Sequence, residues 1–211
     1  MTIPRRFPIE YPSRVLDLID VMEEQAIKRD LIASFTLLAA SSLLTIPFER
    51  MKSNHFLHDK NVDKDLAAKR KELEKAKFLS AAFWGTEPPK QDDWRQFKIV
   101  SEFKKVFHEL DGSGSYLLTN GSENAIEKKS TENVLRVIRN ALAHGNIVYL
   151  NSNGEEICDE QVYFFAFLSR YEESQEQKDE SETYRIIITK VDEFLRFTKL
   201  WAKWISKSGD K

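Results

Sequence analysis

The stretch TENVLRVIRNALAHG, residues 131–145, decides the fold hypothesis because it contains one complete amphipathic helix and its stop signal. At about 100° per residue, six apolar side chains fall within one broad arc: Val134, Leu135, Val137, Ile138, Ala141 and Leu142. The rest of the circumference carries Arg136, Arg139, Asn140, Ala143 and His144, and Gly145 is well placed to end the helix. The sequence therefore predicts a helix that buries one face and presents arginine, amide and imidazole groups on the other.

Apolar residues also recur at helical spacing upstream of this stretch. They predict helices over residues 14–29, with Ser13 as the cap, and over 31–46, 61–83 and onward from Asp92. The second of these is apolar nearly all round, but it is short for a membrane span and carries several hydroxyls. We therefore expect it to be a buried core helix, which Pro47 ends or bends.

The pattern changes after Gly145 to short apolar runs separated by turns. Residues 147–150, 162–168 and 184–189 are rich in β-branched and aromatic side chains, which predicts strands, and Asn153-Gly154 predicts a tight turn. Residues 191–205 then read as a closing helix. The predicted fold class is mainly α, a helical bundle with a small antiparallel β-sheet inserted before the C-terminal helix. We expect one domain over 1–211, with a helical part at 13–145, a β insertion at about 146–190 and a closing helix at 191–206.

Composition limits the classes of protein that fit. Hydrophobic residues make up 41% and charged residues 31%, which is typical of a globular chain. A net charge of -2 gives no general attraction to nucleic acid, so any RNA contact must depend on local positive charge. The single cysteine, Cys158, excludes an internal disulfide and a cysteine-based zinc site. With no signal peptide visible at the N-terminus, these features favour a cytoplasmic location.

The polar face of the 131–145 helix suits a phosphodiester. A guanidinium fork can hold two phosphate oxygens, and a histidine can take or give a proton near neutral pH. RNA supplies its own nucleophile, the 2′-hydroxyl, so this chemistry needs no metal-bound water. An arginine and a histidine five residues apart also occur by chance, however, and His144 could simply cap the helix or bond a core carbonyl. Spacing alone leaves both readings open.

A family resemblance adds to this interpretation. Arg139-Asn140-Ala141-Leu142-Ala143-His144 resembles the R-x4-H motif of the HEPN superfamily, in its Arg-Asn-x-x-x-His form. Upstream, an apolar helix ending in Pro47-Phe48-Glu49-Arg50 is similar to a helix end of a plasmid- and defence-associated HEPN branch. The resemblance implies a metal-independent endoribonuclease of a bacterial toxin or defence system, without a cofactor. It also implies a homodimer in which motif residues of both subunits line one RNA-binding cleft.

The resemblance assigns roles to individual residues. Arg139 would hold the scissile phosphate, His144 would handle the proton or stabilise charge, and Asn140 would orient the imidazole or the phosphate. Arg136 and Arg50 are further candidates for substrate binding, although Arg50 could instead form an ion pair with Glu49 that holds the bundle.

Partners and rival functions follow from the same resemblance. An antitoxin or regulatory protein is a possible partner, and no membrane is implied. One toxin subgroup is adenylylated on a tyrosine two residues after the histidine; here Asn146 stands at that position, which argues against that control. Two other readings stay open: a catalytically inactive HEPN module that binds RNA or nucleotide, and a dimeric interaction scaffold. His55, His58 and Asp59 lie together in a polar segment that we interpret as a loop rather than a metal site.

Overall fold

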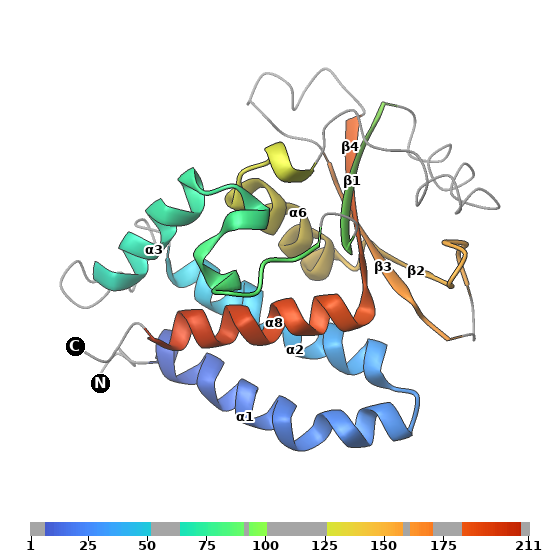
Figure 1. Cartoon of the computed structure of the whole chain (residues 1–211), viewed down its shortest axis with the longest axis horizontal. Coiled ribbons are helices and arrows are strands. Elements are labelled where there is room, and N and C mark those ends of the chain that lie inside the picture. The colour runs from blue at the N-terminus through green and yellow to red at the C-terminus, as the bar shows by residue number, and fades with distance from the viewer. Residues whose placement is uncertain are drawn as a thin grey trace. The chain divides into compact units, whose positions relative to one another are not determined.

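The computed structural model describes residues 7–51, 64–90, 93–100, 126–157, 161–170 and 183–207. Figure 1 shows its helices and strands. Its contacts divide the chain into two compact units. The helical unit comprises Met1–Pro88, Ser130–Glu132 and Phe194–Lys211, and the sheet unit comprises Pro89–Lys129 and Asn133–Glu193. The fold is mainly helical, and it has a small four-stranded antiparallel sheet before the C-terminal helix. This architecture confirms the predicted fold class. The single domain over 1–211 stays a prediction.

Two packed helices begin the helical unit: α1, Phe7–Lys28, and α2, Ile32–Arg50. Helix α1 starts seven residues before the predicted position, so the prediction of Ser13 as its cap is wrong. The reason is that Pro8 and Pro12 are buried within the helix instead of preceding it. At the other end Asp30, with φ of 55°, reverses the chain, and the Leu31 amide bonds the Ala26 carbonyl at 2.8 Å.

Helix α2 is long and apolar enough to span a membrane by length and composition alone. Its contacts within the helical unit are those of a core helix. Leu43 and Leu44 are buried, and the indole Nε1 of Trp201 donates a 2.9 Å hydrogen bond to the Leu43 carbonyl. The helix continues past Pro47 to Arg50, so Pro47 does not end it.

Helix α3, Lys64–Lys75, is shorter than the predicted helix over 61–83. Two 3-10 turns, η1 (Phe78–Ser80) and η2 (Ala82–Trp84), follow it. The helix stops because the Ala76 carbonyl accepts hydrogen bonds from the amide and the hydroxyl of Thr131, at 2.9 and 3.0 Å, and Lys77 is extended.

The closing helix α8, Val191–Ser206, agrees with the predicted range. From Phe194 onward it belongs to the helical unit, where its aromatic side chains meet those of the 3-10 turns. The Phe83 ring lies 5.5 Å from that of Phe197 and 5.8 Å from that of Trp201, both edge to face. This contact between distant segments forms the aromatic core of the helical unit.

The sheet unit contains β1 (Trp94–Val100), β2 (Ile147–Leu150), β3 (Phe164–Arg170) and β4 (Thr183–Lys190). All neighbours are antiparallel, in the order β1-β4-β3-β2. The predicted turn follows β2, where the Gly154 amide bonds the Asn151 carbonyl at 3.0 Å. Strand β2 has the predicted bounds, β4 extends one residue further at each end, and β3 begins and ends two residues later than predicted.

Strand β1 replaces the start of the helix predicted from Asp92, so that prediction is wrong over residues 94–100. Trp94 and Phe97 are three residues apart, which suits a helix, but each residue of β1 pairs with a residue of β4. Trp94 and Gln96 are buried on one face and Phe97 on the other, as alternation along a strand requires. The later residues of that predicted helix and the loop predicted at 111–124 lie outside the described residues.

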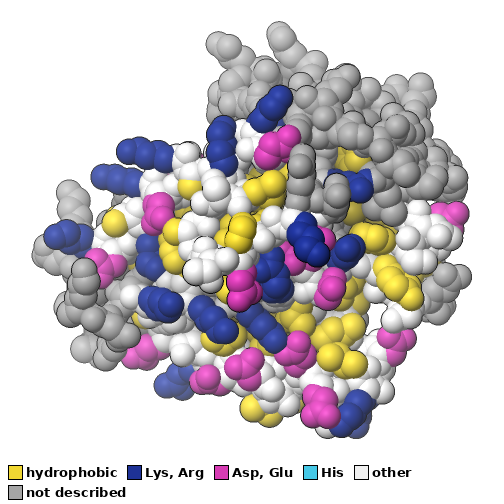
Figure 2. Space-filling view, in the orientation of Figure 1, with side chains coloured by type: hydrophobic (Ala, Val, Ile, Leu, Met, Phe, Trp, Pro, Cys, Tyr) yellow, Lys and Arg dark blue, Asp and Glu magenta, His cyan; other side chains and the backbone are white. Residues whose placement is uncertain are grey.

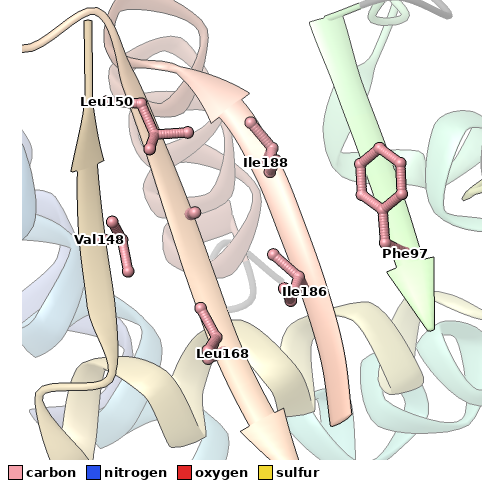
Figure 3. Packing of buried hydrophobic residues seen from close by; sticks show 7 residues of the cluster. Phe97, Val148, Leu150, Leu168, Ile186 and Ile188 are labelled. Atoms are coloured by element: carbon pink, nitrogen blue, oxygen red, sulfur yellow. The ribbon is translucent and has the colours of Figure 1, made fainter. Parts of the chain in front are cut away.

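Both faces of the sheet are buried. On one face, side chains from all four strands meet in an apolar cluster (Figure 3): Phe97, Val148, Leu150, Ala166, Leu168, Ile186 and Ile188. The opposite face carries Phe165, Phe167 and Ile187, and helix α6 (Thr131–His144) lies against it. The sheet therefore provides the rigid support for the helix that bears the predicted motif.

Candidate active site on helix α6

Helix α6 begins at Thr131 and ends at His144. Five of the six residues of the predicted apolar arc are buried, and Leu142 is half-buried: the buried ones are Val134, Leu135, Val137, Ile138 and Ala141. Burial of these side chains fixes which side of the helix faces outward. The predicted arc is confirmed.

Gly145 ends the helix as predicted. Its φ is 70°, a left-handed conformation that residues with a side chain rarely adopt, and the Asn146 amide bonds the Ala141 carbonyl at 3.0 Å. This hydrogen bond closes the last turn in the way typical of a glycine-terminated helix. A Cβ at Gly145 would meet no atom within 4 Å, so backbone strain rather than space selects glycine.

Strand β3 holds the end of α6 on both sides of His144. Before the histidine, the Asn140 Nδ2 donates a 3.3 Å hydrogen bond to the Ser169 hydroxyl. After it, the Asn146 carbonyl accepts a 2.9 Å hydrogen bond from the Leu168 amide. Because Leu168 and Ser169 are consecutive residues of one strand, the backbone around His144 is fixed to the sheet.

The motif side chains differ in exposure. His144 and Ala143 are exposed, whereas Arg139 is half-buried and its Nη1 atom is shielded from solvent. Arg136 is half-buried, and its Nη2 donates a 3.0 Å hydrogen bond to the Asn133 side chain one turn earlier. The predicted polar face therefore exists, with the imidazole as its most accessible group.

Arg50 is on a different helix, α2. It is the last residue of α2, it is buried, and it belongs to the helical unit, whereas Arg136, Arg139, Asn140 and His144 belong to the sheet unit. The structure brings the four α6 residues together on one helix. The contribution of Arg50 to substrate binding stays a prediction.

Two residues beside the motif were missed in the sequence. Ser169, which holds Asn140, is 29 positions away in the chain. Arg185 on β4 pairs with Ser169 in the sheet register and is only 2% exposed, so the strand neighbour of Ser169 is a buried arginine. The available signal was a serine and an arginine interrupting otherwise apolar strands.

A metal-ion site would require several ligand side chains that lie together. Within the part of the chain that the structure describes, no group of three or more His, Cys, Asp or Glu side chains could hold a metal ion. His55, His58, Asp59 and Cys158 lie outside the described residues.

The arrangement on α6 combines an accessible imidazole, which can exchange protons with solvent or a ligand, with arginines on the same polar face. Guanidinium groups bind oxyanions by paired hydrogen bonds, so this face can bind an anionic group next to a proton-transfer group. The sheet-anchored helix end keeps these groups in a fixed order along α6.

Comparison with known protein families agrees with the predicted superfamily. A family model described as HEPN pEK499 p136 matches residues 1–211, and hence the whole sequence. No curated protein and no solved structure matches the chain. The matched range spans the whole chain, and it confirms the predicted membership of the HEPN superfamily. The chain belongs to the HEPN pEK499 p136 family, within the HEPN superfamily.

Proposed function

We propose that the protein is a metal-independent endoribonuclease that cuts RNA at the polar face of α6. The observation that carries the proposal is an exposed His144 at a helix end that β3 fixes on both sides, with Arg136 and Arg139 on the same face. Exposure leaves the imidazole accessible to a substrate, and the fixed backbone lowers the cost of orienting it. Membership of a HEPN family supports the same reaction class.

The reaction is an internal phosphoryl transfer. The 2′-oxygen attacks the adjacent phosphorus, the bond from phosphorus to the 5′-oxygen breaks, and the products end in a 2′,3′-cyclic phosphate and a 5′-hydroxyl. The proton leaves the 2′-hydroxyl and a proton reaches the 5′-oxygen. His144 serves one of these transfers, because an imidazole ring can both accept and donate a proton.

The other polar residues bind or position. Arg139 holds the nonbridging oxygens of the scissile phosphate with the outer part of its guanidinium, and Arg136 contacts a neighbouring phosphate. Asn140 donates its amide hydrogen to Ser169, so we assign it a positioning role that fixes the rotation of α6. Arg50 remains a candidate for a further phosphate contact.

The active form in this proposal is a homodimer. A single α6 face is convex and open to solvent, where water and salt weaken its hold on a phosphate. Two such faces opposed across a twofold axis form a cleft in which positive groups converge. This also explains how a chain of net charge -2 could attract RNA locally. Within this proposal the protein acts in the cytoplasm as a toxin or defence effector, held in check by an antitoxin or regulatory protein.

The decisive experiment incubates purified protein with a mixed RNA, with and without excess EDTA. We expect cleavage in both samples and products that carry a 2′,3′-cyclic phosphate. A strict requirement for magnesium or manganese, or products with another end group, would contradict the mechanism. RNA that is retained on a filter but not cut would assign an inactive binding module instead.

A dilution series tests the shared cleft. Specific activity should fall when the protein is diluted below the dissociation constant of the dimer, because each half-site alone binds phosphate weakly. Light scattering at the same concentrations gives the mass directly. Full specific activity from a monomer across the series would exclude the shared cleft and leave the single-face reaction standing.

A further inference from the structure

Three exposed side chains of helix α3 form a line along its outer side, which we call the lysine row: Lys64, Lys71 and Lys75. At about 100° per residue, they fall within roughly 60° of the helix circumference, together with the small side chain of Ala68. The row extends for about 16 Å along the helix axis. Leu66 and Leu73, each 1% exposed, lie on the opposite side and are buried in the helical unit.

The acidic residues of α3 interact with other cations of the same helix. The Glu74 carboxylate lies 3.1 Å from the Arg70 Nε atom. Asp65 and Glu72 lie four residues before and three residues after Lys69, and both interact electrostatically with its charged form. Within the part of the chain that the structure describes, the side chains of the lysine row form no ion pair or hydrogen bond. Their positive charge is therefore available to a partner.

Charge is segregated within the helical unit, which contains both α1 and α3. Helix α3 has five basic and three acidic side chains, whereas α1 has two basic and five acidic ones. Figure 2 shows Lys and Arg side chains over α3 and acidic side chains along α1. A chain of net charge -2 therefore still presents a locally positive surface, to which a polyanion is attracted.

The positions of the lysines make their charges repel one another. Lys71 and Lys75 are four residues apart on the same side of α3, and like charges at this spacing destabilise a helix. Among the described residues, no acidic partner offsets the repulsion. A bound row of phosphates would relieve it, because each phosphate carries a negative charge.

We propose that the lysine row binds the phosphate backbone of RNA, at phosphates other than the one at which the strand is cut. The choice of RNA as the polyanion rests on the proposed function. A lysine ammonium is a compact point charge on a flexible stem, so it contacts a phosphate without the fixed geometry that a guanidinium fork requires. Phosphate contacts position a nucleic acid without reading its bases. The row therefore binds RNA of any sequence.

RNA fits the lysine row better than a lipid surface or a protein partner does. A helix that lies on a membrane inserts an apolar face beside its cations, but the leucines of α3, Leu66 and Leu73, are buried. Interfaces between proteins have an apolar centre and are depleted in lysine, whereas Ala68 is the apolar side chain beside the row. Binding to a phosphate backbone requires only the cations.

The test measures binding of the full chain to a mixed-sequence RNA oligonucleotide with all 2′-hydroxyls methylated, which the proposed reaction cannot cut. Fluorescence anisotropy gives the dissociation constant over a series of salt concentrations. In the triple variant Lys64→Gln/Lys71→Gln/Lys75→Gln, the slope of log affinity against log salt should become shallower by about 2, at about 0.7 per phosphate contact on a single strand. Its loss of affinity should therefore grow about a hundredfold for each tenfold decrease in salt.

The matched control removes three lysines that form ion pairs with acidic side chains: Lys28→Gln/Lys190→Gln/Lys199→Gln. Both triple variants change the net charge by the same amount, but the control should keep the wild-type slope. Thermal melting shows whether each variant is folded, and Lys71→Gln against Lys28→Gln repeats the comparison with one charge each. Wild-type affinity and slope in the folded lysine-row variant would overturn the proposal. Equal losses in both triple variants would also overturn it, because net charge alone would explain them.

Cleavage of unmodified RNA, measured in parallel, separates this inference from the proposed function. In the lysine-row variant KM should rise while kcat stays constant, because the row does not contact the reacting phosphate. If the wild type binds RNA through the row but does not cut it, the proposed function fails and the inference stands. If the wild type cuts RNA and both triple variants bind equally well, the inference fails and the proposed function stands.

Anionic vesicles of phosphatidylserine and phosphatidylcholine test the lipid alternative. The wild type should not sediment with them. Sedimentation that is lost in the lysine-row variant, without binding to the methylated oligonucleotide, would overturn the proposal and assign the row to a lipid surface.

Discussion

The sequences at the ends of α2 and α6 both resemble HEPN features, yet the two helix ends differ in their burial. At the end of α2, Pro47, Phe48 and Arg50 are buried in the helical unit. At the end of α6, Ala143 and His144 are exposed, and the nearby backbone is bonded to β3. One helix end is part of a core, and the other is a supported surface.

This difference separates structural from chemical roles. A buried helix end contributes through packing, so its substitution should change the free energy of unfolding. An exposed side chain on a fixed backbone contributes little to folding, so its substitution should change only the reaction.

The largest expected effect is on cleavage by His144→Ala. Loss of a proton-transfer group lowers the rate by about 10²–10⁴-fold. The melting temperature should stay unchanged, since exposed substitutions shift stability by less than about 0.5 kcal/mol. Arg139→Ala separates activity from stability less well, because Arg139 is half-buried. Full activity in folded His144→Ala would remove the catalytic assignment.

Phe48→Ala should lower the free energy of unfolding and leave cleavage per folded molecule unchanged. The side chain is buried in the helical unit, and truncating a buried phenylalanine costs about 3–5 kcal/mol. Urea unfolding measures the loss, with Ile27→Ala as a control that should change little. Activity per folded molecule should persist in Phe48→Ala. A stable variant that has lost cleavage would instead place the α2 end in the RNA site.

Much of the fold could be predicted from local patterns. Helix α6, its glycine stop, the strands β2 to β4 and α8 each carry a complete signal within a few residues. Strand β1 could not be predicted from local patterns, because Trp94 and Phe97 fit a helical period. The deciding interaction is the pairing with β4, about ninety positions later. The end of α3 likewise depends on Thr131, 55 positions after Ala76.

The candidate site likewise contains some features that could be predicted from the sequence and others that could not. Arg139, Asn140 and His144 form a contiguous motif that can be read directly in the sequence. The partner of Asn140 cannot, because Ser169 reaches it only through the packing of α6 on the sheet. Exposure is also a tertiary property, which is why the half-burial of Arg139 was not predicted.

Ser169→Ala should have an intermediate effect. It removes the acceptor of the Asn140 hydrogen bond, which costs about 0.5–1.5 kcal/mol. If Asn140 acts by positioning α6, kcat should fall while KM stays nearly constant, and Ser169→Thr should restore activity because it keeps the hydroxyl. A rise in KM alone would indicate that Asn140 contacts the RNA directly.

The smallest expected effect concerns Lys69, a titratable group of the helical unit that has no part in the proposed reaction. Burial lowers the pKa of Lys69 from 10.5 to about 8. Its Nζ also donates to the Trp204 carbonyl and lies 4.2 Å from the centroid of that indole ring, contacts that favour the charged form.

The sign of the effect follows from proton binding. Between about pH 8 and about pH 10.5, the unfolded chain keeps a proton on Lys69 that the folded chain has released, so raising the pH stabilises the folded protein. The wild type should therefore gain melting temperature relative to Lys69→Met over this range, with a constant difference below it. His144→Ala should show no such trend relative to wild type. If the wild type instead loses stability relative to Lys69→Met as the pH rises, the contacts with Trp204 outweigh burial and hold Lys69 in its charged form.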